Sequence, residues 1–282
     1  MGEAAAPAVP GTSRFVTSEV DGARLELWSA GSGPDVVLVE GGGTDAASYR
    51  RLVARLSERA RVHVYDRRGR GRSAPRPDGY GLATEVGDLR TVLAETGATR
   101  VIGHSVGGLM ALAAAREVPI GRLALFDPAV SVDGSFPVDF LPDLERAVAD
   151  GDLVEAVVVA GRGLRTPGSS LPRPVQRAVV RGLMRTAPGR TMVELVGTVP
   201  PETRFVVQED GPAGRWAGVT ATTRLFVGAR SPRYYLPAAR ELAAAMPDAD
   251  VEVVPRVGHD AVARAPWPVV ESLVSFLEPD PA

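Results

Sequence analysis

Residues 100–109, Arg-Val-Ile-Gly-His-Ser-Val-Gly-Gly-Leu, decide the fold of this chain. An apolar run of strand type leads into the stretch, and a helix-forming run, residues 109–116, leaves it. We therefore predict a strand, a sharp turn with Ser105 at its apex, and a helix. Gly103 and Gly107 flank the apex, where a strained backbone leaves little room for side chains. The start of the helix would present N–H groups to an oxyanion developing near Ser105.

Short strand-like runs alternate with longer helical runs on both sides of this stretch. The expected strands are residues 14–20, 24–29, 35–39, 61–65, 101–103, 123–126, 223–227 and 250–254, and the expected core helices are residues 47–58, 81–96, 236–246 and 268–277. Such alternation predicts the α/β class, with a mostly parallel sheet flanked by helices.

The alternation is interrupted between residues 131 and 218. Helical stretches are expected there at 141–149, 152–160 and 174–185, separated by proline-rich joints at 166–174 and 199–201. We interpret this segment as a helical cap inserted into a core made of residues 14–130 and 219–282. Residues 1–13 are rich in Ala, Pro and Gly, lack the pattern of a signal peptide, and are expected to form a flexible tail.

Composition narrows the function. A net charge of −2 and a pI near 6.0 give no reason to expect a nucleic-acid or membrane partner. The absence of cysteine excludes disulfides and thiolate sites, and all 32 basic residues are arginine, which excludes a lysine Schiff base. No apolar stretch approaches the ~18 residues of a membrane span. We expect a cytoplasmic protein that acts on a small molecule without a metal or organic cofactor.

Serine is a weak nucleophile unless a neighbouring base removes its proton. The chain has three histidines. His63 lies inside an expected strand, and His104 adjoins Ser105 with its side chain expected to point away. His259 follows the last expected strand, at the carboxyl edge where ligands bind in open α/β sheets. We predict that His259 is the base.

The chain resembles proteins of the α/β-hydrolase fold from about residue 14 to residue 277. The resemblance rests on the elbow Gly-His-Ser-Val-Gly-Gly, on the loop Tyr-Asp-Arg-Arg-Gly-Arg-Gly-Arg-Ser at 65–73, on the Gly-His pair near the end of the chain, and on the order of elements. It implies Ser105 as nucleophile, His259 as base, and an oxyanion hole made by the N–H groups of Val106 and Gly42.

One departure from the family pattern concerns the acid that orients the base. Many relatives carry a carboxylate where this chain has Ser231, which cannot stabilise an imidazolium. Some relatives carry the acid one strand earlier, and that position is Asp127. We predict Asp127 as the orienting acid, the alternative being a strand-end aspartate that only accepts loop N–H bonds.

A second departure is Glu40, where relatives usually have histidine before Gly41. In one interpretation Glu40 turns away from the pocket and pairs with an arginine of the 66–73 loop. In the other it faces the pocket and takes part in chemistry other than ester hydrolysis. Glu40, Gly41, His104, Phe136 and Phe140 are the candidate pocket residues.

These features favour a serine hydrolase that cleaves a carboxylic ester, thioester or lactone through an acyl-enzyme. Two alternatives stay open: a non-hydrolytic enzyme of small-molecule biosynthesis, such as a cyclase or acyltransferase, and a non-catalytic binder of a small molecule. The sequence specifies neither the substrate nor the oligomeric state.

Overall fold

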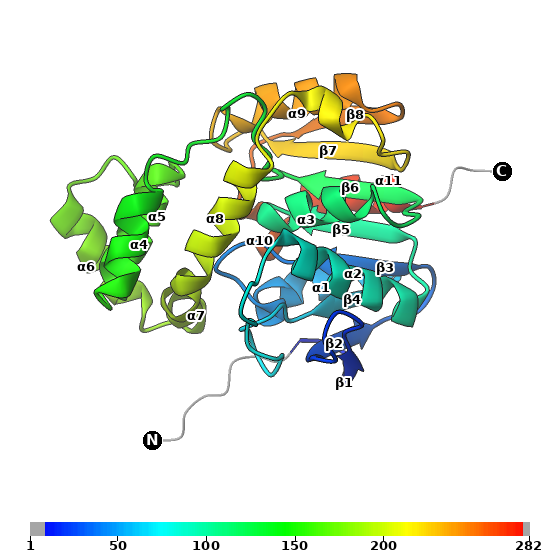
Figure 1. Cartoon of the computed structure of the whole chain (residues 1–282), viewed down its shortest axis with the longest axis horizontal. Helices are drawn as coiled ribbons and strands as arrows, with labels where there is room; N and C mark the ends of the chain where they lie inside the picture. The colour runs from blue at the N-terminus through cyan, green and yellow to red at the C-terminus, as the bar shows by residue number, and fades with distance from the viewer. Residues whose placement is uncertain (1–8, 279–282) are drawn as a thin grey trace.

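Eight strands of the computed structural model form a single sheet between layers of helices (Figure 1). The structure describes residues 9–278. The strands are β1 (Thr12–Thr17), β2 (Arg24–Ala30), β3 (Asp35–Val39), β4 (Arg61–Tyr65), β5 (Arg100–His104), β6 (Arg122–Phe126), β7 (Thr222–Gly228) and β8 (Ala249–Val254). Their order across the sheet is β1-β2-β4-β3-β5-β6-β7-β8. Pairings of β1 with β2 and of β2 with β4 are antiparallel, and the others are parallel, so the predicted mostly parallel sheet is confirmed.

Helices cover both faces of this sheet, as its apolar strands require. One face packs against α2 (Leu82–Thr96), α3 (Val106–Ala114) and α9 (Tyr235–Ala245). The other face packs against η1 (Ala46–Tyr49), α1 (Arg50–Leu56), α10 (Ala261–Arg264) and α11 (Trp267–Leu277). The continuous apolar run of β3 is buried from Val36 to Val39 because it lies between these two layers.

The first strand begins earlier than the sequence suggested. Residues 1–8 of the expected tail lie outside the described part of the chain. Thr12 and Ser13, which were also expected in the tail, pair with Ser29 and Trp28 in the antiparallel β1–β2 ladder. Because Thr12 and Ser13 have polar side chains, the sequence pattern did not predict that they belong to a strand. An edge strand can complete its backbone pairing without an apolar sequence.

The segment between β6 and β7 is helical. It contains α4 (Leu141–Ala149), α5 (Leu153–Gly163), α6 (Arg173–Leu183), α7 (Ala187–Leu195), η2 (Val196–Thr198), α8 (Val199–Gln208) and η3 (Ala213–Trp216). In Figure 1 α4 to α7 stand away from the sheet, and α8 runs between them and the core. We call this segment the cap.

The expected joint at Val199-Pro200-Pro201 is instead the beginning of α8. Proline fits there because the first N–H groups of a helix have no intrahelical partner to lose. This correction matters because the first turn of α8 brings Glu202 to the edge of the core.

The parallel strands all end at the same edge of the sheet. Ser105 follows β5 directly, Asp127 follows β6, and the loop after β8 carries His259. The topology thus gathers the predicted site residues at one edge, from three different strands. None of the helices between residues 9 and 278 is long and apolar enough to cross a membrane.

Candidate active site

Ser105 occupies the strained turn that the motif predicts. Its backbone has φ 54° and ψ −124°, a region that residues with side chains seldom adopt. The glycines around it permit the close approach of β5, β3 and α3. A Cβ on Gly103 would stand 2.7 Å from the Cα of Gly108, and a Cβ on Gly107 would stand 2.4 Å from the carbonyl oxygen of Glu40. The local sequence therefore fixes where the Ser105 hydroxyl is presented.

Asp127 and His259 meet at this edge. The Nδ1 atom of His259 is 3.1 Å from Oδ2 of Asp127, whose side chain is fully buried. The other oxygen, Oδ1, accepts a hydrogen bond of 3.2 Å from the backbone N–H of Gly228. Asp127 itself has a φ of 42°, so the chain after β6 is held in an uncommon conformation that directs this carboxylate.

Ser231, at the position where many relatives carry the acid, faces the same carboxylate. Its hydroxyl donates a hydrogen bond of 2.6 Å to Oδ2 of Asp127. A Cβ on Gly228 would stand 2.5 Å from this hydroxyl oxygen, so Gly228 leaves the space that the contact needs. Ser231 thus donates a hydrogen bond to Asp127, which follows the neighbouring strand β6.

Tyr235, at the start of α9, lies against His259. Its ring stacks on the His259 ring with centroids 5.1 Å apart and an interplanar angle of 11°. The Ser105 side chain is among the groups that act on the Tyr235 phenol. Burial raises the pKa of Tyr235 well above its usual value, so the phenol stays neutral. The sequence assigns this tyrosine no catalytic role, since no motif surrounds it.

The His104 ring lies 4.7 Å from the His259 ring, centroid to centroid, and its two nitrogens contact two different loops. Its Nδ1 is 2.7 Å from the Tyr49 hydroxyl, which accepts the N–H of Gly41 at 2.8 Å. Its Nε2 is 3.0 Å from the carbonyl oxygen of His259. Burial, together with the neighbouring His259, lowers the pKa of His104 well below 6.5. A neutral ring can accept from Tyr49 and donate to His259, which fits these partners.

Two backbone N–H groups near Ser105 have no hydrogen-bond acceptor among the described residues. The N–H of Val106 is the first of helix α3 and has no intrahelical acceptor. The N–H of Gly42 donates to no acceptor within residues 9–278. The two residues are neighbours, because a Cβ on Gly42 would lie 3.6 Å from Cγ1 of Val106.

Glu40 pairs with the arginine loop, as the first of its two interpretations predicts. Its Oε1 accepts the backbone N–H of Arg67 at 3.0 Å and lies 3.1 Å from Nε of Arg70. All three side chains are fully or almost fully buried. The loop is anchored further by Asp66, which accepts the N–H of Ala46 at 2.9 Å. Burial raises the pKa of Asp66 to about 6.

Glu202 of the cap enters the same cluster and was not found from the sequence. Its Oε1 accepts hydrogen bonds from Arg67 at 3.1 Å, Arg70 at 2.6 Å and Arg76 at 3.2 Å. Burial acts to raise the pKa of Glu202, but these arginines hold that pKa below the usual value of a glutamate. The first turn of α8 is thereby bound to the core beside Gly42. An acidic residue directly after two prolines was the available signal, since this pattern is typical of a helix start.

A cavity of about 440 Å³ is lined mostly by residues of the cap, and Tyr234 is the lining residue that the core contributes. Phe136 and Tyr234 line it, and their ring centroids are 5.2 Å apart. Tyr234 in turn contacts Tyr235, so a row of aromatic rings runs from the cavity to His259. Phe140 does not line this cavity. It belongs to the cap's own apolar cluster, where its ring packs closely on Gly163.

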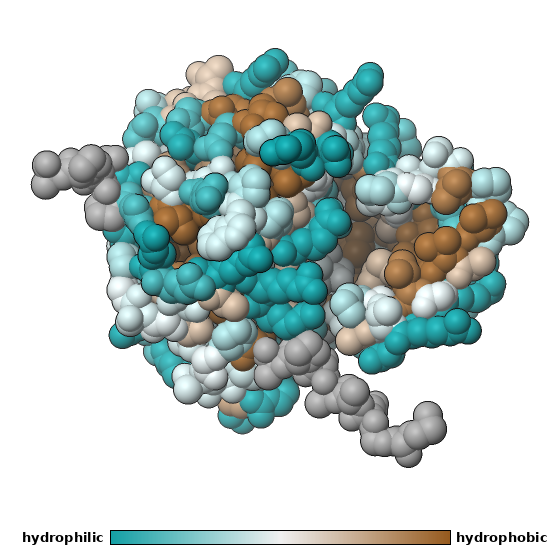
Figure 2. All heavy atoms as spheres, turned by 180° about the vertical axis from the view of Figure 1, so that it is seen from behind, coloured by the Kyte–Doolittle hydropathy of each residue, from teal (hydrophilic) through white to brown (hydrophobic). Residues whose placement is uncertain are grey.

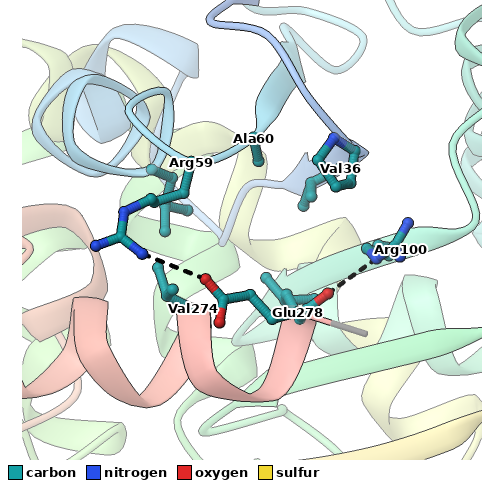
Figure 3. Close-up of a pocket in the computed structure, with 9 residues that line it drawn as sticks. Val36, Arg59, Ala60, Arg100, Val274 and Glu278 are labelled. Atoms are coloured by element: carbon teal, nitrogen blue, oxygen red, sulfur yellow. Dashed lines mark hydrogen bonds and ion pairs between the residues drawn. The ribbon is translucent and has the colours of Figure 1, made fainter. Parts of the chain in front are cut away.

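The shallow depression in Figure 3 lies elsewhere. Val36, Arg59, Arg100 and Val274 line it, at the beginnings of β3 and β5 and therefore at the opposite edge of the sheet from Ser105. Its volume is about 30 Å³, room for roughly one water molecule. No cluster of three or more potential metal ligands occurs in the described part of the chain.

Comparison with known proteins agrees with this architecture. An uncharacterized protein of Mycobacterium tuberculosis is 33% identical over 180 residues, which are 58% of this chain and 52% of that protein. The chain thus spans about half the length of that relative. RutD of Caulobacter segnis, a suggested carbamate hydrolase, is 27% identical over 278 residues, covering 94% of this chain and 99% of RutD.

Among solved structures, an alpha/beta hydrolase from Sphaerobacter thermophilus is similar, with a TM-score of 0.79 and 29% identity over 94% of this chain and all of that one. The family model described as the alpha/beta hydrolase family matches residues 36–271. That match runs from β3 into α11 and includes the elbow, Asp127 and His259. The chain therefore belongs to the alpha/beta hydrolase family.

Proposed function

We propose that the protein is a serine hydrolase that cleaves a carboxylic ester, thioester or lactone of a small molecule. The contact between His259 and the buried Asp127, next to Ser105 on its strained turn, is the observation that supports this proposal most directly. A serine becomes a useful nucleophile when a base oriented in this way adjoins it.

In the proposed reaction the Ser105 hydroxyl attacks the substrate carbonyl while Nε2 of His259 takes the hydroxyl proton. Asp127 keeps the Nδ1–H tautomer of His259 and stabilises the imidazolium that forms. The N–H groups of Val106 and Gly42 bind the oxyanion of the tetrahedral intermediate, and each such donor contributes about 3–4 kcal/mol in comparable sites.

The intermediate then collapses. The bond from the carbonyl carbon to the leaving oxygen or sulfur breaks, and His259 returns its proton to that atom. Water, deprotonated by His259, attacks the acyl-enzyme, and the acid leaves as Ser105 regains its proton. No step requires a metal or an organic cofactor.

The two features that favoured non-hydrolytic chemistry, Glu40 and Ser231, both make structural contacts. Oε1 of Glu40 is held by Arg67 and Arg70 of the arginine loop. The acid lacking at Ser231 is supplied by Asp127. Near this site, the cavity offers the substrate the rings of Phe136 and Tyr234 together with charged groups such as Arg165.

The test is steady-state turnover of a substrate panel: p-nitrophenyl acetate, an acyl thioester, a simple lactone and an aryl carbamate, the last because of the likeness to RutD. We expect Ser105→Ala, His259→Ala and Asp127→Asn each to lower kcat/KM by about 10³-fold or more on the substrates that are turned over. His63→Gln is the matched control, since His63 lies on β4 and contacts Ser29 of β2 and Asp35 of β3. Turnover that survives Ser105→Ala, or absence of turnover on the whole panel, would contradict the proposal.

A further inference from the structure

Helix α6 of the cap exposes a stripe of large apolar side chains. Val175, Val179 and Leu183 are 45, 50 and 44% exposed, and Leu171 before the helix and Met184 after it are 43 and 36% exposed. Side chains four residues apart lie above one another on one face of a helix, so these residues form a continuous band. Figure 2 shows apolar side chains gathered on the outer part of the cap, at the right of the view, with hydrophilic groups beside them.

The stripe is not required by the packing of the cap. The inward side of α6 already contributes Val180 to a small apolar cluster with Val158 of α5 and Val193 of α7. Gln176 is also buried and closes the preceding loop by donating to the carbonyl oxygens of Gly168, Ser169 and Leu171. The apolar arc of α6 is thus wider than its neighbours cover, and a contiguous exposed apolar surface usually marks an interaction site.

Positive charge is concentrated around this stripe. Residues 156–193 contain seven arginines and no acidic residue, in a chain whose net charge is −2. Arg173 and Arg177 form ion pairs with Glu155 of α5. The other five make no ion pair with any residue from 9 to 278; they are Arg162, Arg165, Arg181, Arg185 and Arg190.

We propose that α6 is a docking surface for membranes that contain anionic lipids. A helix with an apolar stripe beside arginines lies in the plane of a bilayer interface, with the apolar side chains among the acyl chains and the arginines at the phosphates of the headgroups. The charge disfavours a second copy of the chain as the occupant, because it would bring two arginine-rich segments together.

The position of α6 suits this role. Figure 1 places α6 at the end of the cap farthest from the sheet. Docking there leaves the edge that carries Ser105 free of the bilayer. The expectation that the protein has no membrane partner relied on the net charge of the whole chain, which conceals this local excess of arginine.

The test is co-sedimentation of the full chain with vesicles of phosphatidylcholine alone or of phosphatidylcholine mixed with phosphatidylglycerol. We expect binding to the mixed vesicles only, weakened by added salt. Val179→Asp, and separately Arg181→Glu with Arg185→Glu, should each lower the partition coefficient by about tenfold or more. Turnover of a water-soluble ester by these variants should match that of the unaltered protein, which verifies that they fold.

Matched controls lie outside the cap. Val253→Asp on β8 replaces a valine that is 43% exposed, and Arg51→Glu reverses an exposed arginine of α1; neither should change vesicle binding. The proposal is overturned if the mixed vesicles do not retain the protein, or if Val179→Asp binds them as tightly as the unaltered chain. It is also overturned if ultracentrifugation without lipid finds a dimer that Val179→Asp dissociates, since the stripe would then contact a second copy.

Discussion

At the scale of single residues, Asp127 contacts both Ser231 and His259 through one carboxylate oxygen. The Ser231 hydroxyl donates to Oδ2 of Asp127, and Nδ1 of His259 lies 3.1 Å from the same oxygen. Ser231→Ala removes that donor and should weaken the hold on the Asp127 carboxylate by about 1 kcal/mol. We therefore expect kcat/KM for p-nitrophenyl acetate to fall by roughly fivefold to tenfold. Steady-state kinetics with the protein shown to be folded will measure this.

The matching control is a transfer of the acid between the two positions. Asp127→Asn alone should lose about 10³-fold or more in kcat/KM, and adding Ser231→Asp should recover part of that loss. If Ser231→Ala is as damaging as Asp127→Asn, Ser231 has a role beyond support of the aspartate.

Glu40 gives a second prediction for a single residue. Glu40 pairs with Arg67 and Arg70, so we expect Glu40→Gln to leave kcat/KM within about threefold. The same substitution should lower the free energy of unfolding by about 1–3 kcal/mol, because the two buried arginines lose a carboxylate partner. Urea unfolding and ester turnover of the same preparation separate the two effects. Loss of turnover with unchanged stability would assign Glu40 to the chemistry.

At the scale of secondary-structure elements, α8 is bound to the core by a buried carboxylate. Glu202→Leu would leave Arg67 and Arg70 in the interior without this partner, so we expect a loss of about 3–5 kcal/mol in the free energy of unfolding, measured by urea titration. Glu145→Leu is the matched control, because Glu145 of α4 pairs with Arg204 of α8 near the surface. That variant should change stability by less than about 1 kcal/mol. Equal losses in both variants would contradict a special role for the buried pair.

The secondary-structure elements also separate the features that could be predicted from the sequence from those that could not. The elbow around Ser105, the succession of strands and helices along the chain, and the edge carrying Asp127 and His259 could be predicted, because each depends on local pattern and on strand direction. Glu202 could not be placed, since its arginine partners lie more than 120 residues away. The contact of Tyr235 with His259 could not be predicted for the same reason, because it depends on how α9 packs against the loop after β8.

At the scale of the whole molecule, buried His104 couples folding to pH. Burial depresses its pKa in the folded chain, whereas an unfolded histidine titrates near 6.5. Below that pH the unfolded chain binds a proton that the folded chain does not, so stability falls as the pH drops. The contribution reaches about 1.4 kcal/mol per pH unit.

Urea unfolding between pH 7.5 and pH 5.5, in steps of about one unit, isolates this contribution when the unaltered chain is compared with His104→Gln. Asp66 acts in the opposite sense, because its pKa of about 6 lies above that of an unfolded aspartate, and it is common to both proteins. The difference in slope therefore belongs to His104. Parallel slopes would show that the buried histidine takes up a proton without cost.

The central claim concerns the nucleophile, and the most direct measurement is the mass of the protein after treatment with a fluorophosphonate. We predict one adduct per chain, located on the peptide that contains Ser105, absent in Ser105→Ala and strongly slowed in His259→Ala and Asp127→Asn. No adduct on the unaltered chain, or an adduct that persists in Ser105→Ala, would contradict the proposed Ser105–His259–Asp127 site.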